Sequence, residues 1–133
     1  MARLGGAQAL PVLVERLSLE EATYPRSVIY EIMGEMGAEG TWHILAEGAV
    51  NEAEYTRLSA VKAMARIAPE KTAPYLIPLL QSEAPWVRSD AAAIASQVCA
   101  PETLPYLQEL LQDEEFEIRF LAGQAIRKIE TRR

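Results

Sequence analysis

Apolar residues recur along this chain with the spacing of a helix, and the pattern itself repeats. Arginines stand 31 residues apart, at Arg26, Arg57, Arg88 and Arg119. Apolar residues follow each arginine by three, six and ten positions: Ile29, Ile32, Met36, Ala60, Ala63, Ile67, Ala91, Ile94, Val98, Ala122, Ala125 and Ile129. This spacing puts them on one stripe of a helix. The pattern predicts a helix of about 13 residues, roughly 20 Å long, after each arginine.

A second helix is predicted upstream of each of these. Three of the upstream segments carry proline at the same place, Pro11, Pro74 and Pro105, and the fourth carries His43 there. Proline suits the first turn of a helix, where its missing N–H would have had no partner. Six residues before the arginines stand Glu20, Asn51, Ser82 and Asp113. Because three of these four are good N-cap types, we expect this position to close the turn between the two helices.

The unit is therefore a helix, a short turn and a second helix. We expect one all-α domain over residues 1–133, built from repeats 6–37, 38–68, 69–99 and 100–130. Residues 1–5 match the last turn of a second helix and predict a partial repeat or cap, so the chain is expected to begin in mid-repeat. Either the N-terminal cap is degenerate or the chain is a segment of a longer array.

Repeated helix pairs of this period resemble the HEAT-like repeats of the phycobilisome-lyase type. Residues 79–92 and 110–119 carry a leucine pair, an acidic turn and an apolar-Arg entry to the second helix. The first repeat departs most, with Pro25 before its arginine and Ile29 in a small-residue position. The resemblance implies a right-handed α-solenoid of four helix pairs, with first helices on the convex side and second helices on the concave side. Stacked pairs of this kind bury a continuous core between neighbours.

Composition and charge exclude several classes of function. The chain has 13 Lys and Arg against 19 Asp and Glu, a net charge of −6, which opposes nucleic-acid binding. No segment reads as a signal peptide or membrane span, and the single cysteine, Cys99, implies no oxidising compartment. We therefore predict a cytoplasmic protein with no nucleic-acid or membrane partner.

No residues form a pattern typical of catalysis or of metal and cofactor binding. His43 is the sole histidine, and nothing in the sequence converges on it as an acid–base or metal partner. Cys99 has no cationic neighbour that would activate it, so a small, partly buried thiol is expected. The chain is predicted not to be an enzyme and to hold no cofactor.

Each arginine of the 31-residue series has two interpretations. It could contact an anion, or it could donate hydrogen bonds to turn residues of its own or the next repeat. The resemblance implies the architectural role, which identical spacing in every repeat also favours.

Two features favour protein binding instead. Tyr24, Tyr55 and Trp86 each precede an arginine by two residues, and could be interface anchors or could cover the seam between repeats. Five and nine residues after the arginines, the expected concave face carries Glu31, Glu35, Lys62, Arg66, Ala93, Gln97, Gln124 and Lys128. Its sign changes along the array, which suits a protein partner better than a phosphate backbone. The main site is predicted around Lys62 and Arg66, with Tyr55 and Trp86 at its edge, roughly 10 Å apart.

The C-terminal repeat carries a further apolar feature. Phe120 and Leu121 follow Arg119, where the other repeats have at least one polar residue. Since no fifth repeat is expected to cover them, we predict that this end docks onto another copy or a partner.

The favoured function is a non-catalytic protein-interaction module or scaffold subunit. The resemblance leaves two alternatives, a chromophore-lyase subunit or related chaperone and an alkylated-base DNA glycosylase, and the acidic charge opposes the second. Related iron hydroxylases carry several His-Glu pairs, whereas His43 is followed by Ile44, so that activity is excluded.

Overall fold

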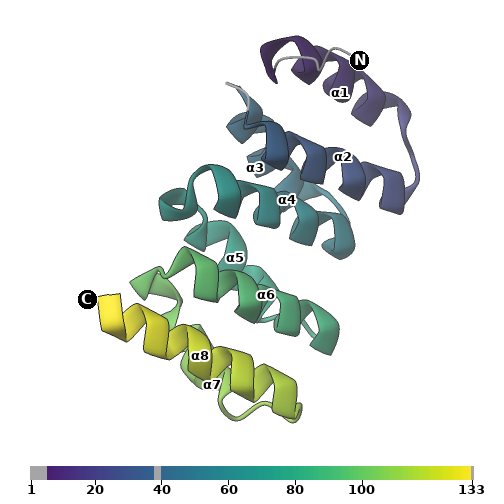
Figure 1. Cartoon of the computed structure of the whole chain (residues 1–133). Coiled ribbons are helices and arrows are strands. Elements are labelled where there is room, and N and C mark those ends of the chain that lie inside the picture. The colour runs from purple at the N-terminus through teal and green to yellow at the C-terminus, as the bar shows by residue number, and fades with distance from the viewer. Residues whose placement is uncertain (1–5, 38–39, 133) are drawn as a thin grey trace. The chain divides into compact units, whose positions relative to one another are not determined.

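The part of the chain that the structure describes is helical and contains no strand (Figure 1). The computed structural model describes residues 6–37 and 40–132, without the side chains of residues 6–8 and 24. The expected partial repeat at residues 1–5 lies outside the described residues. The elements are α1 (Gly6–Leu19), α2 (Thr23–Met36), α3 (Thr41–Asn51), α4 (Glu54–Ile67), the 3₁₀ turn η1 (Pro69–Lys71), α5 (Ala73–Leu80), α6 (Pro85–Val98), the 3₁₀ turn η2 (Pro101–Thr103), α7 (Leu104–Leu110) and α8 (Phe116–Arg132).

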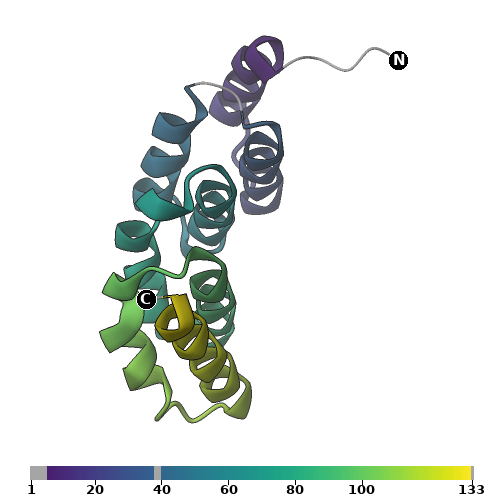
Figure 2. The ribbon, with the colours of Figure 1, turned by 60° about the vertical axis from the view of Figure 1, so that its left-hand side comes forward.

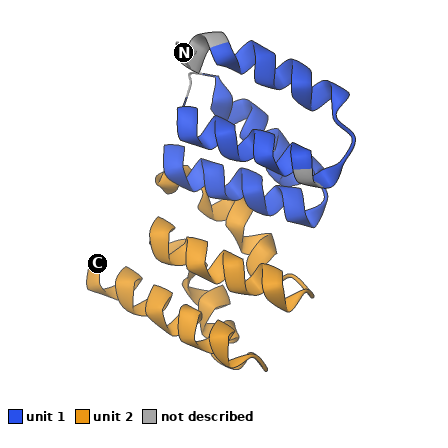
Figure 3. Cartoon of the chain, turned by 45° about the vertical axis from the view of Figure 1, so that its right-hand side comes forward, with its two compact units in different colours: residues 1–67 blue, residues 68–133 orange. Residues whose placement is uncertain are grey.

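The chain divides into two compact units, Met1–Ile67 and Ala68–Arg133 (Figure 3). In the first unit α2 packs along α4, α3 covers α4, and α1 packs on α2. In the second unit α6 packs along α8, while α5 lies on α6 and α7 on α8. Figure 2 shows the resulting two layers in the second unit, with α5 and α7 in one and α6 and α8 in the other. Within each unit, therefore, the second helices pack along one another and a first helix packs on each of them, as expected.

Most residues of the predicted stripe are buried, and the clearest exception lies in α2. Ala60, Ala91 and Ala122 are fully buried, which lets neighbouring helices approach closely. The expectation for Ile32 is wrong, because its side chain is 36% exposed while the adjacent Met33 is buried. Ile29, Tyr30 and Met33 of the same helix are buried, so α2 packs through these three side chains.

The prolines occupy two different places. Pro74 and Pro105 are the second residues of α5 and α7, in the first turn as predicted. The same expectation for Pro11 is wrong, since α1 begins at Gly6 and Pro11 lies in its second turn. There the missing N–H removes one intrahelical hydrogen bond.

The turn residues before the arginines are not N-caps. Glu20, Ser82 and Asp113 each accept a hydrogen bond from the backbone N–H two residues later, at 3.1 Å. The following helix begins beyond that N–H, and the N-cap of both α2 and α6 is an alanine. These side chains therefore stabilise the connection between the two helices and do not cap the second helix.

None of the described helices combines the length and apolar character that crossing a bilayer requires.

Candidate functional site

Each second helix exposes two equivalent positions, and we call this set of positions the second-helix face. It consists of the positions five and nine residues after each arginine: Glu31, Glu35, Lys62, Arg66, Ala93, Gln97, Gln124 and Lys128. All eight side chains are exposed. The face is acidic on α2, basic on α4 and uncharged on α6.

On α4 the predicted site residues form a single stripe. Lys62 and Arg66 lie seven and eleven residues after Tyr55, so helical geometry puts all three side chains within a narrow sector. Tyr55 is 42% exposed, at the beginning of the helix. Arg66 Nη1 lies 3.7 Å from Glu35 Oε1 of α2, and both side chains are more than half exposed. An ion pair this exposed contributes little to stability, and the two basic groups remain accessible to an incoming partner.

The other predicted aromatic residues have different outcomes. Trp86, 48% exposed, stands two residues before Arg88 on α6. It belongs to the second compact unit and Tyr55 to the first, so their expected separation stays a prediction. The side chain of Tyr24 lies outside the described residues.

All four arginines donate to carbonyl groups of the turn before their helix. Nη1 of Arg88 lies 2.9 Å from Ser82 O, and Nη1 of Arg119 lies 2.7 Å from Asp113 O. Arg26 reaches Leu17 O and Glu20 O, both at 2.7 Å, and Arg57 Nε lies 2.8 Å from Glu52 O. Carbonyls at the end of a first helix have no intrahelical donor, and the guanidinium supplies one. These contacts support the architectural interpretation.

Arg26 also forms a cluster that joins two repeats. Its Nε lies 3.1 Å from both carboxylate oxygens of Glu52, and its Nη2 donates to the same carboxylate. Tyr30 donates its hydroxyl to Glu52 Oε2 at 2.8 Å. The hydrogen bonds from Arg26 lower the pKa of Glu52 and raise that of Arg26, while burial and the bond to Glu52 raise the pKa of Tyr30. A carboxylate that is ionised and fully engaged in this way is a structural tie rather than a catalytic base.

Arg88 makes the corresponding contact in the second unit. Its Nε lies 2.8 Å from Asp113 Oδ2, and its Nη2 lies 3.3 Å from Oδ1. Burial alone would raise the pKa of Asp113, but hydrogen bonds from Arg88 and from the Glu115 N–H outweigh it and lower the pKa. In both units, therefore, the arginine of one repeat binds a carboxylate in the turn of the next.

A groove of about 440 Å³ lies beside the Arg26 cluster in the first unit. Val14 and Leu17 of α1 and Ile44 and Glu47 of α3 line it, together with the cluster. The groove offers apolar side chains and one exposed carboxylate, because Glu52 and Arg26 are already bonded to each other. It has the chemistry of a contact surface for an apolar side chain.

The C-terminal repeat exposes more aromatic surface than predicted. Phe120 is 51% exposed and Leu121 is half-buried. Phe116, which was not predicted as part of this surface, is 72% exposed. The rings of Phe116 and Phe120 stack with centroids 6.4 Å apart, and Leu111, which follows α7, is exposed as well. The i, i+4 spacing of the two phenylalanines was the signal available in the sequence.

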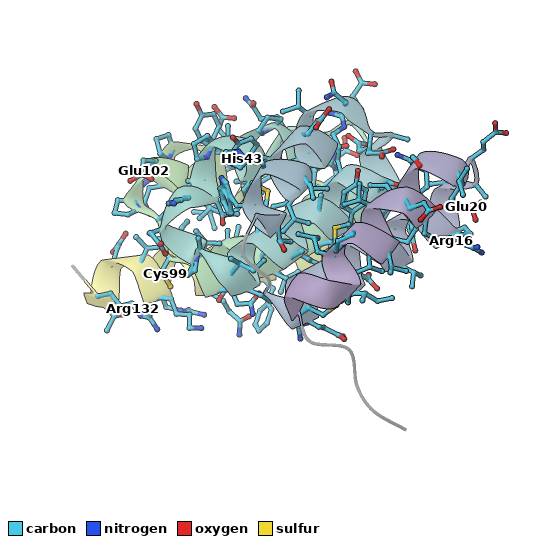
Figure 4. The ribbon with its side chains drawn as sticks, turned by 90° about the horizontal axis from the view of Figure 1, so that it is seen from above. Arg16, Glu20, His43, Cys99, Glu102 and Arg132 are labelled. Atoms are coloured by element: carbon cyan, nitrogen blue, oxygen red, sulfur yellow. The ribbon has the colours of Figure 1, made fainter. Side chains whose placement is uncertain are left out.

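Neither the histidine nor the cysteine belongs to a reactive constellation in the described residues. His43 is exposed in the first turn of α3 (Figure 4). Cys99 is half-buried, follows α6 with φ 52°, and donates its thiol to Ser96 O at 3.0 Å. Across the described residues, no three His, Cys, Asp or Glu side chains gather as metal ligands would.

A second series with the 31-residue period was not predicted. Thr41, Thr72 and Thr103 stand at the turns between repeats and are fully buried. Thr72 and Thr103 donate their hydroxyls to Ala68 O at 2.9 Å and Ala100 O at 2.7 Å. The signal was the spacing. The role of Thr72 and Thr103 is structural, since each of these two hydroxyls satisfies a turn carbonyl.

Comparison with protein-family models matches residues 43–127 to HEAT repeats, which is more than half of the chain. No curated protein matches the chain.

Proposed function

Because the chain belongs to the HEAT repeat family, we propose that it is a non-catalytic module that binds another protein on its second-helix face. Stacked helix pairs present extended surfaces of the kind that grip other proteins. The observation that carries the proposal is the exposed stripe of Tyr55, Lys62 and Arg66 on α4. An aromatic anchor and two cations on one stripe suit an acidic peptide or helix that also carries an apolar side chain.

The proposal includes the finer features expected from the sequence. These are a right-handed solenoid of four helix pairs with a 31-residue period, the phycobilisome-lyase type of repeat, a cytoplasmic location, and docking of the C-terminal repeat onto another copy or a partner. Superposing the repeats tests the period, since the Cα atoms of the four arginines should then coincide.

Finding the partner is the first experiment. Affinity capture from the source cell with the parent chain is compared with capture by Lys62→Glu/Arg66→Glu. We expect the partner to be lost from the variant and retained by Arg16→Glu, which reverses an exposed charge on α1. Capture of a bilin-carrying protein would favour the chromophore-lyase alternative. Equal capture by all three chains would place the site elsewhere.

Binding kinetics with the purified partner then separate the aromatic contact from the charged contacts. Trp86→Ala should chiefly speed dissociation, at a cost of about 2 kcal/mol if the indole is a hot spot. Lys62→Glu should chiefly slow association and flatten its dependence on salt. If both variants stay folded and bind like the parent, the second-helix face is not the site.

A further inference from the structure

The outer face of α8, turned away from α6 and α7, carries an apolar stripe with opposite charges at its two ends. Phe116, Phe120, Gly123 and Arg127 lie within a narrow sector of the helix, opposite the buried side chains of Ile118, Ala122, Ala125 and Ile129. The two phenylalanines occupy the first half of the stripe and Arg127 the second. Exposed aromatic surface of this kind marks an interaction site.

The charges that flank this stripe are also arranged by position. Glu117 lies in the first turn of α8, and Lys128 lies three turns later on the same flank. On the other flank the Arg119 guanidinium donates to Asp113 O and Glu114 O and lies over the Phe116 ring, so it is bonded within its own repeat. Beyond Lys128 the helix continues to Arg132, whose side chain projects from its end (Figure 4).

This arrangement is self-complementary when a second copy of α8 runs in the opposite direction. We infer that two chains associate through an antiparallel α8–α8 contact with its two-fold axis near Gly123. In that register Glu117 faces the partner's Lys128. The two-fold contact repeats this pair, giving two attractive pairs. A parallel arrangement would instead place Arg127 opposite the partner's Arg127 on the seam.

The apolar seam fits the same register. Phe120 lies opposite the partner's Arg127, whose guanidinium can cover the aromatic ring. Gly123 at the axis has no side chain, and a Cβ built there would meet only Leu111 Cδ2, at 3.9 Å. The bare backbone at this point lets the two helices approach closely.

The contact is small. The 17 residues of α8 span about 25 Å, so one helix pair buries less than the roughly 1,600 Å² of a standard interface. A weak, reversible dimer is the expected result. The inference deepens the docking proposed for the C-terminal repeat and does not depend on the α4 stripe.

Sedimentation equilibrium of the full chain, with charge-reversal variants, tests this register. Between about 5 and 500 µM the parent's average mass should rise from one chain toward two. Glu117→Lys and Lys128→Glu each create two repulsive pairs, so each variant alone should dimerise at least tenfold more weakly. Mixed in equal amounts, the two variants restore both attractive pairs and should associate at least as well as the parent. Glu109→Lys on α7, with the same change in charge, should behave like the parent.

The outcomes separate the parts of the inference. A parent chain that stays monomeric at 500 µM would overturn self-association, whatever happens to partner binding on α4. Single variants that dimerise like the parent would overturn the antiparallel register. Recovery in the mixture shows that both variants are folded, and failure to recover while both keep the parent's circular dichroism would also overturn the register.

Discussion

Gly34 shows how one residue sets the distance between two helices. A Cβ built on Gly34 of α2 would lie 2.5 Å from the Cβ of Ala63 on α4, closer than packed carbon atoms can be. Gly48 has the same role against a side chain, since a Cβ there would lie 2.6 Å from Cζ of Tyr30. The Tyr30 ring therefore reaches Glu52 because α3 has no side chain at position 48.

Gly34→Ala should destabilise the first unit by about 2 kcal/mol, because α2 and α4 would have to separate. Gly123→Ala is the matched control, since its Cβ has room and alanine is favoured over glycine inside a helix by roughly 1 kcal/mol. Urea unfolding at about 5 µM, where little dimer is expected, gives both values. Equal effects of the two substitutions would contradict the close approach of α2 and α4.

At the scale of elements, the arginines bond both their own turn and the next repeat. Each guanidinium satisfies carbonyls in the turn before its own helix, and in Arg26 and Arg88 it also binds a carboxylate in the next repeat. The interaction is therefore both a cap and a tie between neighbouring repeats. Charge-assisted hydrogen bonds with little exposure contribute more than exposed pairs.

Arg88→Gln should lower the free energy of unfolding by about 2 kcal/mol, because Asp113 keeps its burial and loses its charged donor. The corresponding change in an exposed pair, Arg66→Gln, should cost at most about 0.5 kcal/mol. Chemical unfolding of both variants at neutral pH measures the difference. A cost for Arg88→Gln no larger than for Arg66→Gln would mean that the tie is not stabilising.

The Arg26 cluster predicts a dependence of stability on pH at both ends of the scale. The pKa of Glu52 is lowered from 4.5, so its contribution is complete above that value and is lost as the pH falls below it. The pKa of Tyr30 is raised from 10.0, so its contribution is present below pH 10 and is lost as the pH rises beyond it.

The parent loses the contribution of Tyr30 as the pH rises, whereas Tyr30→Phe has no hydroxyl to ionise. The difference in the free energy of unfolding between the parent and Tyr30→Phe should therefore shrink as the pH rises from about 7 to 11. Urea unfolding of the parent and of Tyr30→Phe at stepped pH values measures this difference. If the free energy of unfolding of Tyr30→Phe changes with pH as the parent's does, the environment of the Tyr30 hydroxyl does not raise its pKa.

At the scale of the whole molecule, the helices differ in how many neighbours hold them. In the first unit α4 packs against both α2 and α3, whereas α1 packs chiefly on α2. Three aliphatic side chains of α1 are also exposed, among them Leu19 at 71%. Helices with few buried contacts open at low free energy, while those with many open only with the whole unit.

Native-state hydrogen exchange should therefore show the least protection in α1 and the most in α4 within the first unit. In the second unit α6, which packs on α5 and α8, should be the best protected. Mass spectrometry of exchanged peptides measures this order. Protection of α1 equal to that of α4 would contradict it.

Much of the helical architecture could be predicted because it depends on local spacing. The stripes after Arg57, Arg88 and Arg119 are largely buried as expected, since helical period and side-chain polarity decide which side of a helix packs. Ile32 was predicted incorrectly because its burial depends on whether another helix covers it, which its spacing along α2 does not tell. The acceptor at Glu52 was missed, since a contact 26 residues away has no local signal.

The sequence by itself determined the recurring helices and the order of turns, because these follow from the period of apolar residues and from turn chemistry along the chain. It also determined that the second-helix face is polar. Only the tertiary structure decided which carboxylate binds Arg26, which glycines allow close contact, and that Phe116 joins Phe120 in an exposed stripe. These depend on atoms brought together from distant positions, where differences of an ångström separate a contact from a clash.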